Sequence, residues 1–149
     1  MWEAPSAGRC VHEKVAPPAM PATIEARYCH VTFRSTHNHY RFSQQVFPAD
    51  TLPISNTDLG PGSLALFCGS TPIFDENTVW FWPNIEEVTE PETLPPLRFD
   101  EQNSWWQTTM TLIEACAKLS RDKYLVGCPD LIERDAEEFL KRLPDSVMY

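Results

Sequence analysis

The sequence lacks the features that would place the protein in a membrane or outside the cell. Its 149 residues include no apolar run of about 18 residues, the length that a transmembrane helix needs. Residues 1–14 hold no apolar core of the kind found in a secretory signal peptide. The five cysteines are odd in number and include no C-x-x-C pair, which is typical of reduced thiols rather than of a disulfide framework. We therefore expect a soluble, cytoplasmic protein that does not enter a membrane.

A basic stripe is missing as well. The formal net charge is -9, and residues 72–101 carry one arginine against eight acidic residues. The affinity of a protein for nucleic acid or for an anionic membrane depends on lysines and arginines that neutralise phosphates. We therefore expect neither nucleic acid nor a membrane surface as a partner.

The length of the chain suits a single domain with a buried core. Residues 1–23 contain four prolines among alanines, a composition that packs and hydrogen-bonds poorly. We expect an irregular or disordered leader in residues 1–23 and one domain in residues 24–149.

The clearest pattern in the sequence lies between Asn103 and Asp130. Apolar residues recur there at three- and four-residue steps as far as Leu119, which predicts a helix that begins at about Ser104. Asn103 or Ser104 would cap its first turn. The short apolar segment Tyr124–Cys128 then predicts a buried parallel strand, and Pro129 ends it because proline has no N–H to donate.

The remaining elements are shorter. Apolar and polar residues alternate in Tyr28–Arg34, which predicts a half-buried strand. Residues 83–102 are rich in proline and glutamate and predict an extended, solvated segment. Further patterns predict, in chain order, a helix in residues 40–48, a strand at Leu52–Ser55, a helix at Ser63–Cys68 ended by Gly69, a strand at Thr78–Trp82 and a helix at Ala136–Leu143.

Two blocks of the sequence carry a family resemblance. The first runs from Trp105-Trp106 through the predicted helix to the segment YLVGCPDLIE at residues 124–133. The second is Leu59–Ala65, followed by Gly69, Pro72–Phe74 and Thr78–Phe81. In this order and spacing, over roughly residues 46–133, the blocks resemble the central part of the uroporphyrinogen decarboxylase superfamily, particularly its members related to corrinoid-dependent methyltransferases.

The resemblance implies an α/β fold, a partial (β/α)8 TIM barrel of the uroporphyrinogen decarboxylase type. A complete barrel takes about 250 residues, so we expect an incomplete one. The implied activity is that of a decarboxylase (a carboxy-lyase) or a corrinoid-dependent methyltransferase, and the implied ligand is a tetrapyrrole or a corrinoid-linked small molecule. The alternative is a non-catalytic fragment or interaction module that pairs its open sheet edge with another chain. We also expect self-association or a partner chain.

The sequence departs from two motifs of that family. Decarboxylase members hold substrate carboxylates with an N-terminal R-Q-A-G-R motif, and only Ala7-Gly8-Arg9 is similar to it here. Methyltransferase members bind zinc through an H-x-C pair and a distant cysteine, and this chain ends before those positions. The local pairs Cys29-His30 and His37-x-His39 lack an evident third ligand, and we interpret them as polar turn residues. We therefore expect no cofactor and no metal in this chain.

Asp130 is the candidate catalytic residue. It follows the carboxyl end of the predicted strand Tyr124–Cys128, and α/β barrels place their chemistry in the loops at that end. The competing interpretation is a turn carboxylate that caps the residues after it.

Four further residues are candidates for substrate binding. Gly60 and Gly62 would let backbone N–H groups approach a carboxylate at a helix start, whereas a tight turn with positive φ is the simpler explanation for glycine there. Trp80 would stack on a tetrapyrrole, although such side chains more often belong to a core. Cys128 completes the set at the end of its strand.

Overall fold

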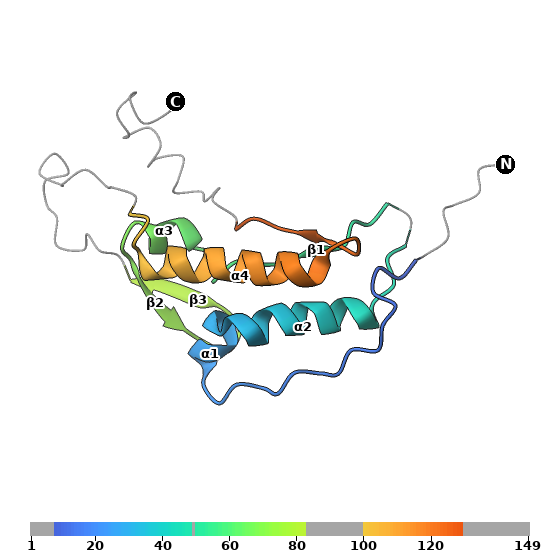
Figure 1. The fold of residues 1–149 in the computed structure, drawn as a ribbon. Helices are drawn as coiled ribbons and strands as arrows, with labels where there is room; N and C mark the ends of the chain where they lie inside the picture. Colours follow the sequence, from blue (N-terminus) through green and yellow to red (C-terminus); the bar gives the residue numbers. More distant parts are fainter. Residues whose placement is uncertain (1–7, 49, 83–99, 130–149) are drawn as a thin grey trace, which may run out of the picture.

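Two helices that lie side by side and run in the same direction, α2 and α4, form the centre of the structure (Figure 1). The computed structural model describes residues 8–48, 50–82 and 100–129. The helices and strands in these residues are, in chain order, α1 (Ile24–Cys29), α2 (Val31–Gln44), β1 (Ile54–Ser55), α3 (Ser63–Phe67), β2 (Thr71–Phe74), β3 (Val79–Trp82), α4 (Ser104–Ser120) and β4 (Leu125–Val126).

The strand predicted at Tyr28–Arg34 is wrong, because this segment is the junction of α1 and α2. His30 starts the second helix: its Nδ1 accepts a hydrogen bond from the backbone N–H of Phe33 at 3.1 Å. The buried face of α2 is largely polar, so its helical period is weak in a hydrophobicity pattern, whereas the local alternation around Phe33 imitates a strand. The buried side chains of α2 are Phe33, Ser35, Asn38, His39, Phe42 and Ser43.

The helix predicted in residues 40–48 is therefore the last part of a longer one. It ends at Gln44, and Gln45 is already extended. The helix thus stops three residues before Phe47, the residue in which Pro48 disfavours helical backbone.

The long helix predicted from about Ser104 is confirmed as α4. The side-chain oxygen of Asn103 accepts hydrogen bonds from the backbone N–H groups of Trp105 at 2.9 Å and Trp106 at 3.2 Å, and so satisfies donors of the first turn. The buried residues of α4, among them Leu112 and Cys116, recur at helical spacing. The parallel strand predicted at Tyr124–Cys128 is confirmed as the short strand β4, but the prediction that it is buried is wrong, because Leu125 is exposed.

The strands form two small sheets. β1 pairs with β4 in parallel, with Ile54 opposite Leu125, while β2 and β3 form an antiparallel pair. The predicted strand at Leu52–Ser55 corresponds to β1 and that at Thr78–Trp82 to β3, and the helix at Ser63–Cys68 corresponds to α3, after which Gly69 has a φ of 100°. β2 was not expected, because Pro72 lies inside it and removes a donor.

The connection from β1 to β4 passes through α3, the β2–β3 pair and α4. Parallel neighbours joined through a helix are the defining unit of α/β proteins. The described residues therefore have a mixed helix and strand content with small sheets, and they contain no closed barrel. The predicted helix Ala136–Leu143 and most of the predicted extended segment lie outside the described residues.

Two hydrophobic clusters hold these elements together. One joins Val11, Phe42 and Tyr124, and so brings the segment before α1 against α2 and the start of β4. The other contains Leu59, Leu66 and Phe67 from the loop after β1 and from α3, with aromatic side chains of β3 and α4 packed against it. Residues 8–23 thus contain no helix or strand, yet Val11 is 1% exposed and anchors them.

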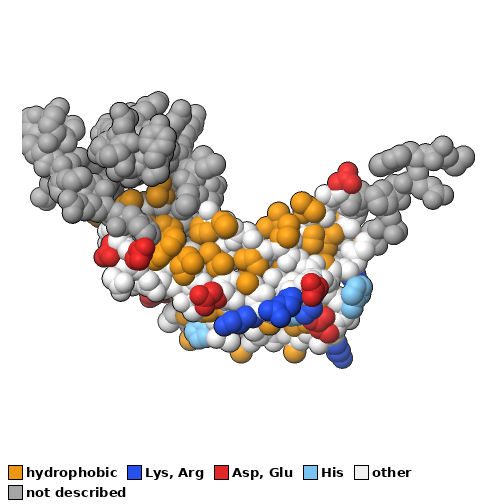
Figure 2. All heavy atoms as spheres, turned by 45° about the horizontal axis from the view of Figure 1, so that its top comes forward, with side chains coloured by type: hydrophobic (Ala, Val, Ile, Leu, Met, Phe, Trp, Pro, Cys, Tyr) orange, Lys and Arg blue, Asp and Glu red, His pale blue; other side chains and the backbone are white. Residues whose placement is uncertain are grey.

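The β1–β4 sheet keeps an apolar side that the described residues do not cover. Ile54 is 51% exposed and Leu125, its partner in register, is 53% exposed. Hydrophobic side chains gather on the face of the molecule that carries this sheet (Figure 2). Parallel sheets are usually buried on both faces, so this side is incomplete as it stands.

Candidate functional site

A groove of about 700 Å³, open to solvent, lies along α2 and the loop that follows β1. Its apolar lining includes Phe33 of α2 and Val79 of β3. Its basic lining comes from the two first helices and comprises Arg27, Arg34, His37 and Arg41. The groove thus lies where a strand of the parallel sheet ends, which is the usual position of ligand sites in α/β folds.

Arg34 is the best-anchored cation of the groove. Its guanidinium donates to the backbone carbonyl oxygens of Tyr28 at 2.7 Å and Asp58 at 2.8 Å, and to the side-chain oxygen of Asn56 at 3.3 Å. Burial lowers the pKa of the Arg34 guanidinium from its ordinary value, but an arginine remains protonated in proteins. The result is a fixed positive charge that joins α1, α2 and the loop after β1.

His37 lies one turn further along α2. Its ring stacks on that of Phe33, with the centroids 5.3 Å apart. Burial lowers the pKa of His37, and the nearby charges of Arg41 and Arg34 lower it further. The neutral imidazole is therefore favoured, and a neutral imidazole has one ring nitrogen that accepts and one that donates a hydrogen bond.

The loop after β1 is held from two sides. From α2, the side chain of Asn38 donates to the backbone oxygen of Asn56 at 2.8 Å. From the other strand of the sheet, the backbone oxygen of Gly127 accepts a hydrogen bond from the hydroxyl of Thr57 at 2.6 Å. These bonds fix the loops that follow β1 and β4 next to each other at the same edge of the sheet.

Gly60 and Gly62 lie in this loop against β3. Gly60 has a φ of 136°, and a Cβ atom there would come within 2.7 Å of the Cβ of Val79. A Cβ atom on Gly62 would overlap the ring of Phe81. Glycine at both positions therefore allows the loop and β3 to approach closely, and Gly60 also borders the groove.

Of the other predicted site residues, Trp80 and Cys128 do not line the groove. Trp80 is 63% exposed and is not among the groove's lining residues. Cys128 is exposed and follows Gly127, so it lies at the sheet edge where the two loops meet. Asp130 lies outside the described residues. The structure thus brings Gly60, Gly62 and the segment before Cys128 to one region, and leaves Trp80 elsewhere.

Trp105 and Trp106 belong to the core. Both pack against the cluster of Leu59, Leu66 and Phe67, and the ring of Trp106 meets that of Phe67 edge-on, with the centroids 5.2 Å apart. Their large apolar areas fill the space between α3 and α4.

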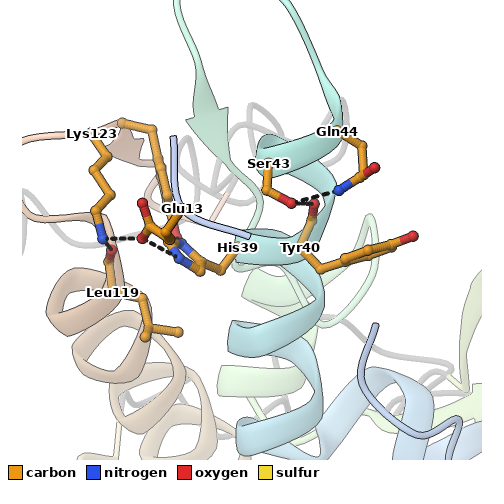
Figure 3. A network of polar contacts seen from close by, with 8 residues as sticks. Glu13, His39, Tyr40, Ser43, Gln44, Leu119 and Lys123 are labelled. Carbon is orange, nitrogen blue, oxygen red and sulfur yellow. Dashed lines mark hydrogen bonds and ion pairs between the residues drawn. The ribbon is translucent and has the colours of Figure 1, made fainter. Parts of the chain in front are cut away.

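A second polar network lies around His39 of α2 (Figure 3). One carboxylate oxygen of Glu13 lies 3.1 Å from Nε2 of His39 and 2.7 Å from Nζ of Lys123. Nδ1 of His39 lies 3.0 Å from the hydroxyl of Tyr124. The hydrogen bond from Lys123 is the largest of the effects that lower the pKa of Glu13 to about 2, whereas burial raises the pKa of Tyr124. The network ties residues 8–23 to α2 and to the turn after α4.

The two histidines of the His37-x-His39 pair lie in different places: His37 borders the groove, and His39 forms a hydrogen bond with Glu13. His30 is occupied as the cap of α2. Within the described ranges, no three or more histidine, cysteine, aspartate or glutamate side chains are grouped to hold a metal ion. We therefore assign no zinc ligand among them.

The sequence interpretation missed Arg27, Arg34 and Arg41 as site residues. Arg34, His37 and Arg41 follow one another at steps of three and four residues, which is the signature of one helical face. This spacing is present in the sequence, but it indicates a common face only when the segment is a helix, and the part with Arg34 was predicted as a strand.

Comparison of the chain with protein-family models, with curated proteins and with solved structures finds no match. In the part of the chain that the structure describes, no helix combines the length and the apolar character needed to cross a membrane. The fold and the groove define an α/β chain with a basic groove beside the end of a parallel strand.

Proposed function

We propose that the chain is a uroporphyrinogen decarboxylase-like protein, a partial (β/α)8 barrel that acts as a carboxy-lyase or as a corrinoid-dependent methyltransferase. Its ligand in this proposal is a tetrapyrrole or a corrinoid-linked small molecule, and its setting is the cytoplasm. The observation that supports the proposal is the parallel pairing of β1 with β4, with the loops after both strands bonded to each other through Thr57 and Gly127.

The order of elements supports the same proposal. A helix precedes each strand of the parallel pair, α2 before β1 and α4 before β4, and the two helices lie side by side and run in the same direction. Repetition of a helix and a parallel strand is what builds an α/β barrel, and the loops at the carboxyl ends of its strands carry the active site.

In this proposal the chain's own residues bind and orient the ligand. The loop from Asn56 to Gly62, braced by Arg34 and Asn38, forms one wall of the site. Residues 127–129 form the adjoining wall, and Asp130, the next residue in the sequence, supplies a carboxylate that binds pyrrole N–H groups or orients a proton. An ionised acceptor makes hydrogen bonds roughly twice as strong as a neutral one.

An absorbance titration tests the proposal. Uroporphyrin, coproporphyrin and cobalamin are titrated into the purified chain, with the urea-unfolded chain as the control for nonspecific stacking. Saturable binding of at least one of them to the folded chain alone is the expected result. If none binds, or if the unfolded chain binds as well, the proposal is wrong.

A second candidate function is that of a non-catalytic interaction module. The observation that favours it is the exposed apolar side of the β1–β4 sheet, where Ile54 and Leu125 lie opposite each other. Such a side is completed when another chain covers it or extends the sheet. Light scattering after size-exclusion chromatography tests this candidate: self-association that Leu125→Glu abolishes is the expected result, and a clean monomer at micromolar concentration contradicts it.

A further inference from the structure

We infer that the basic groove along α2 binds an elongated small molecule with an apolar middle and a carboxylate at each end. The groove shares the loop after β1 with the proposed site, but the inference rests on the charge and spacing of the arginines and not on decarboxylation or methyl transfer.

The groove carries a net positive charge. Three arginines (Arg27, Arg34 and Arg41) and one carboxylate (Asp58) line it, so three positive charges against one negative charge leave +2 with His37 neutral. The whole chain has a net charge of -9. Residues 1–71 contain five lysines and arginines, and three of them border this one groove. Positive charge gathered in a concave surface of an acidic protein favours an anionic ligand.

The arginines of the groove form no ion pair with the described residues that would compete with an anionic ligand. The described residues form ion pairs at His39 and Lys123, both with Glu13, and none at Arg27 or Arg41. Both of these arginines are exposed. Arg34 is already held by neutral acceptors, two backbone carbonyls and an amide side chain. Its position is therefore set before a ligand arrives, which lowers the entropy cost of binding.

The two arginines of α2 are spaced along the helix. Arg34 and Arg41 are seven residues apart on one face of α2, which corresponds to about 10 Å along the helix axis. Between them lies the ring of His37 stacked on Phe33, and Val79 borders the same groove. Two positive charges separated by aromatic and aliphatic surface fit a ligand with anionic ends and an apolar middle.

This spacing also distinguishes carboxylates on an apolar spacer from a compact anion. Inorganic phosphate is too small to contact both Arg34 and Arg41 across about 10 Å. A guanidinium can bind a carboxylate through two parallel hydrogen bonds, which suits the exposed Arg41, whereas Arg34, whose N–H groups already donate to three acceptors, attracts the second carboxylate by its charge. An α,ω-dicarboxylate of suitable length therefore occupies both ends of the groove together. Its methylene chain then covers the apolar surface between them.

Isothermal titration calorimetry with a series of acids tests the inference. The probes are acetate, succinate, adipate, suberate, dimethyl suberate and inorganic phosphate, all at one pH and one ionic strength. We expect affinity to rise with chain length to adipate or suberate, at least tenfold above acetate, and we expect no binding of the uncharged dimethyl suberate. Phosphate should bind no better than acetate.

Variants then locate the site. Arg41→Ala should weaken the binding of the best diacid about tenfold, the value of one charge-assisted contact, and should leave the binding of acetate unchanged because Arg34 remains. Arg121→Ala is the matched control, since Arg121 is an exposed arginine that does not line the groove. Thermal unfolding followed by circular dichroism checks that each variant folds. If Arg41→Ala does not fold, Arg27→Ala takes its place.

Three results would overturn the inference. They are the absence of diacid binding at about 10 mM, equal affinity for phosphate and the best diacid, and an equal loss in the Arg121→Ala and Arg41→Ala variants. If a diacid binds and neither a porphyrin nor cobalamin does, the inference about the groove holds and the proposed function is wrong. If a porphyrin or cobalamin binds and no diacid does, the proposed function holds and the inference about the groove is wrong.

Discussion

The hydroxyl of Thr57 donates a hydrogen bond of 2.6 Å to the backbone oxygen of Gly127, 70 residues further along the chain. Thr57 is 1% exposed, and its hydrogen bond to Gly127 is partly buried. It joins the loop after β1 to the segment after β4 in addition to the backbone ladder, in which the N–H of Gly127 donates to the oxygen of Ser55 at 2.9 Å. The side chain of Thr57 therefore adds to the backbone pairing at the edge of the sheet that carries the proposed site.

Replacing Thr57 with valine should lower the free energy of unfolding by about 1–3 kcal/mol. Valine keeps the shape of threonine but leaves the carbonyl of Gly127 without its donor, and a buried unsatisfied polar group costs about this amount. Urea unfolding followed by circular dichroism measures the change. Thr57→Ser is the matched control, since it keeps the hydroxyl, and an equal loss in both variants would mean that the hydrogen bond is not the cause.

Replacing Gly62 with alanine should also destabilise the protein, by about 1–3 kcal/mol, because the new methyl group overlaps the ring of Phe81. The matched control is Gly8→Ala, since a Cβ atom at Gly8 meets no atom within 4 Å. Thermal and urea unfolding of the two variants decide between a packing role and a ligand role for Gly62. Unchanged stability in Gly62→Ala would contradict the packing role.

The stability of the protein should fall in acid partly because of Glu13. Its pKa in the folded protein is lowered to about 2 from an ordinary value of 4.5, chiefly by the hydrogen bond from Lys123. A lowered pKa stabilises the folded state above the unfolded-state pKa, and that contribution disappears as the pH falls from about 4.5 to about 2. Added salt should reduce it, because Glu13 is exposed and its charge is screened.

The variant Glu13→Gln measures this contribution. Its melting temperature should be below that of the parent at pH 6, and the difference should shrink as the pH approaches 2. Glu25→Gln is the control, since Glu25 is an exposed acid in the first turn of α1 with no ion pair among the described residues. Parallel pH profiles of the parent and Glu13→Gln would show that the network of Figure 3 does not carry the contribution.

Asp130 can be tested although it lies outside the described residues. Asn caps a turn about as well as Asp, so Asp130→Asn should keep the melting temperature of the parent and lose affinity for a tetrapyrrole through loss of the charge. Asp130→Ala should instead lower stability by about 1 kcal/mol if the residue is only a cap. Asp122→Asn is a matched control, because Asp122 has a φ of 62°, a conformation that asparagine also tolerates. Tetrapyrrole binding by Asp130→Asn equal to that of the parent would remove Asp130 from the site.

The helix α4 and the strand β4 could be predicted from the sequence because their signals are local. The cap at Asn103, the apolar steps to Leu119 and the proline after β4 all lie within the segment that they define. The left-handed residue at Gly69 was predictable for the same reason, since few other residues adopt that backbone readily.

The helix α2 could not be predicted in the same way. Its buried side chains Asn38 and His39 are polar and owe their burial to partners far along the chain, namely Asn56 and Tyr124. A pattern of hydrophobicity does not contain those partners. The basic face formed by Arg34 and Arg41 was missed together with the helix. The positive φ predicted for the glycines is found at Gly60 and not at Gly62, where the close packing of Phe81 is what requires glycine.

A nuclear magnetic resonance titration of the uniformly labelled chain with uroporphyrin tests the proposed function most directly, since it locates any binding on the sequence. The proposal predicts saturable shifts of backbone N–H signals in the loop from Asn56 to Gly60 and at Gly127 and Cys128, the two segments that Thr57 joins. Signals of the exposed Trp80 and Trp82 on β3 should move little. Shifts confined to those tryptophans, or no shifts at all, would contradict a tetrapyrrole site at the carboxyl edge of the β1–β4 sheet.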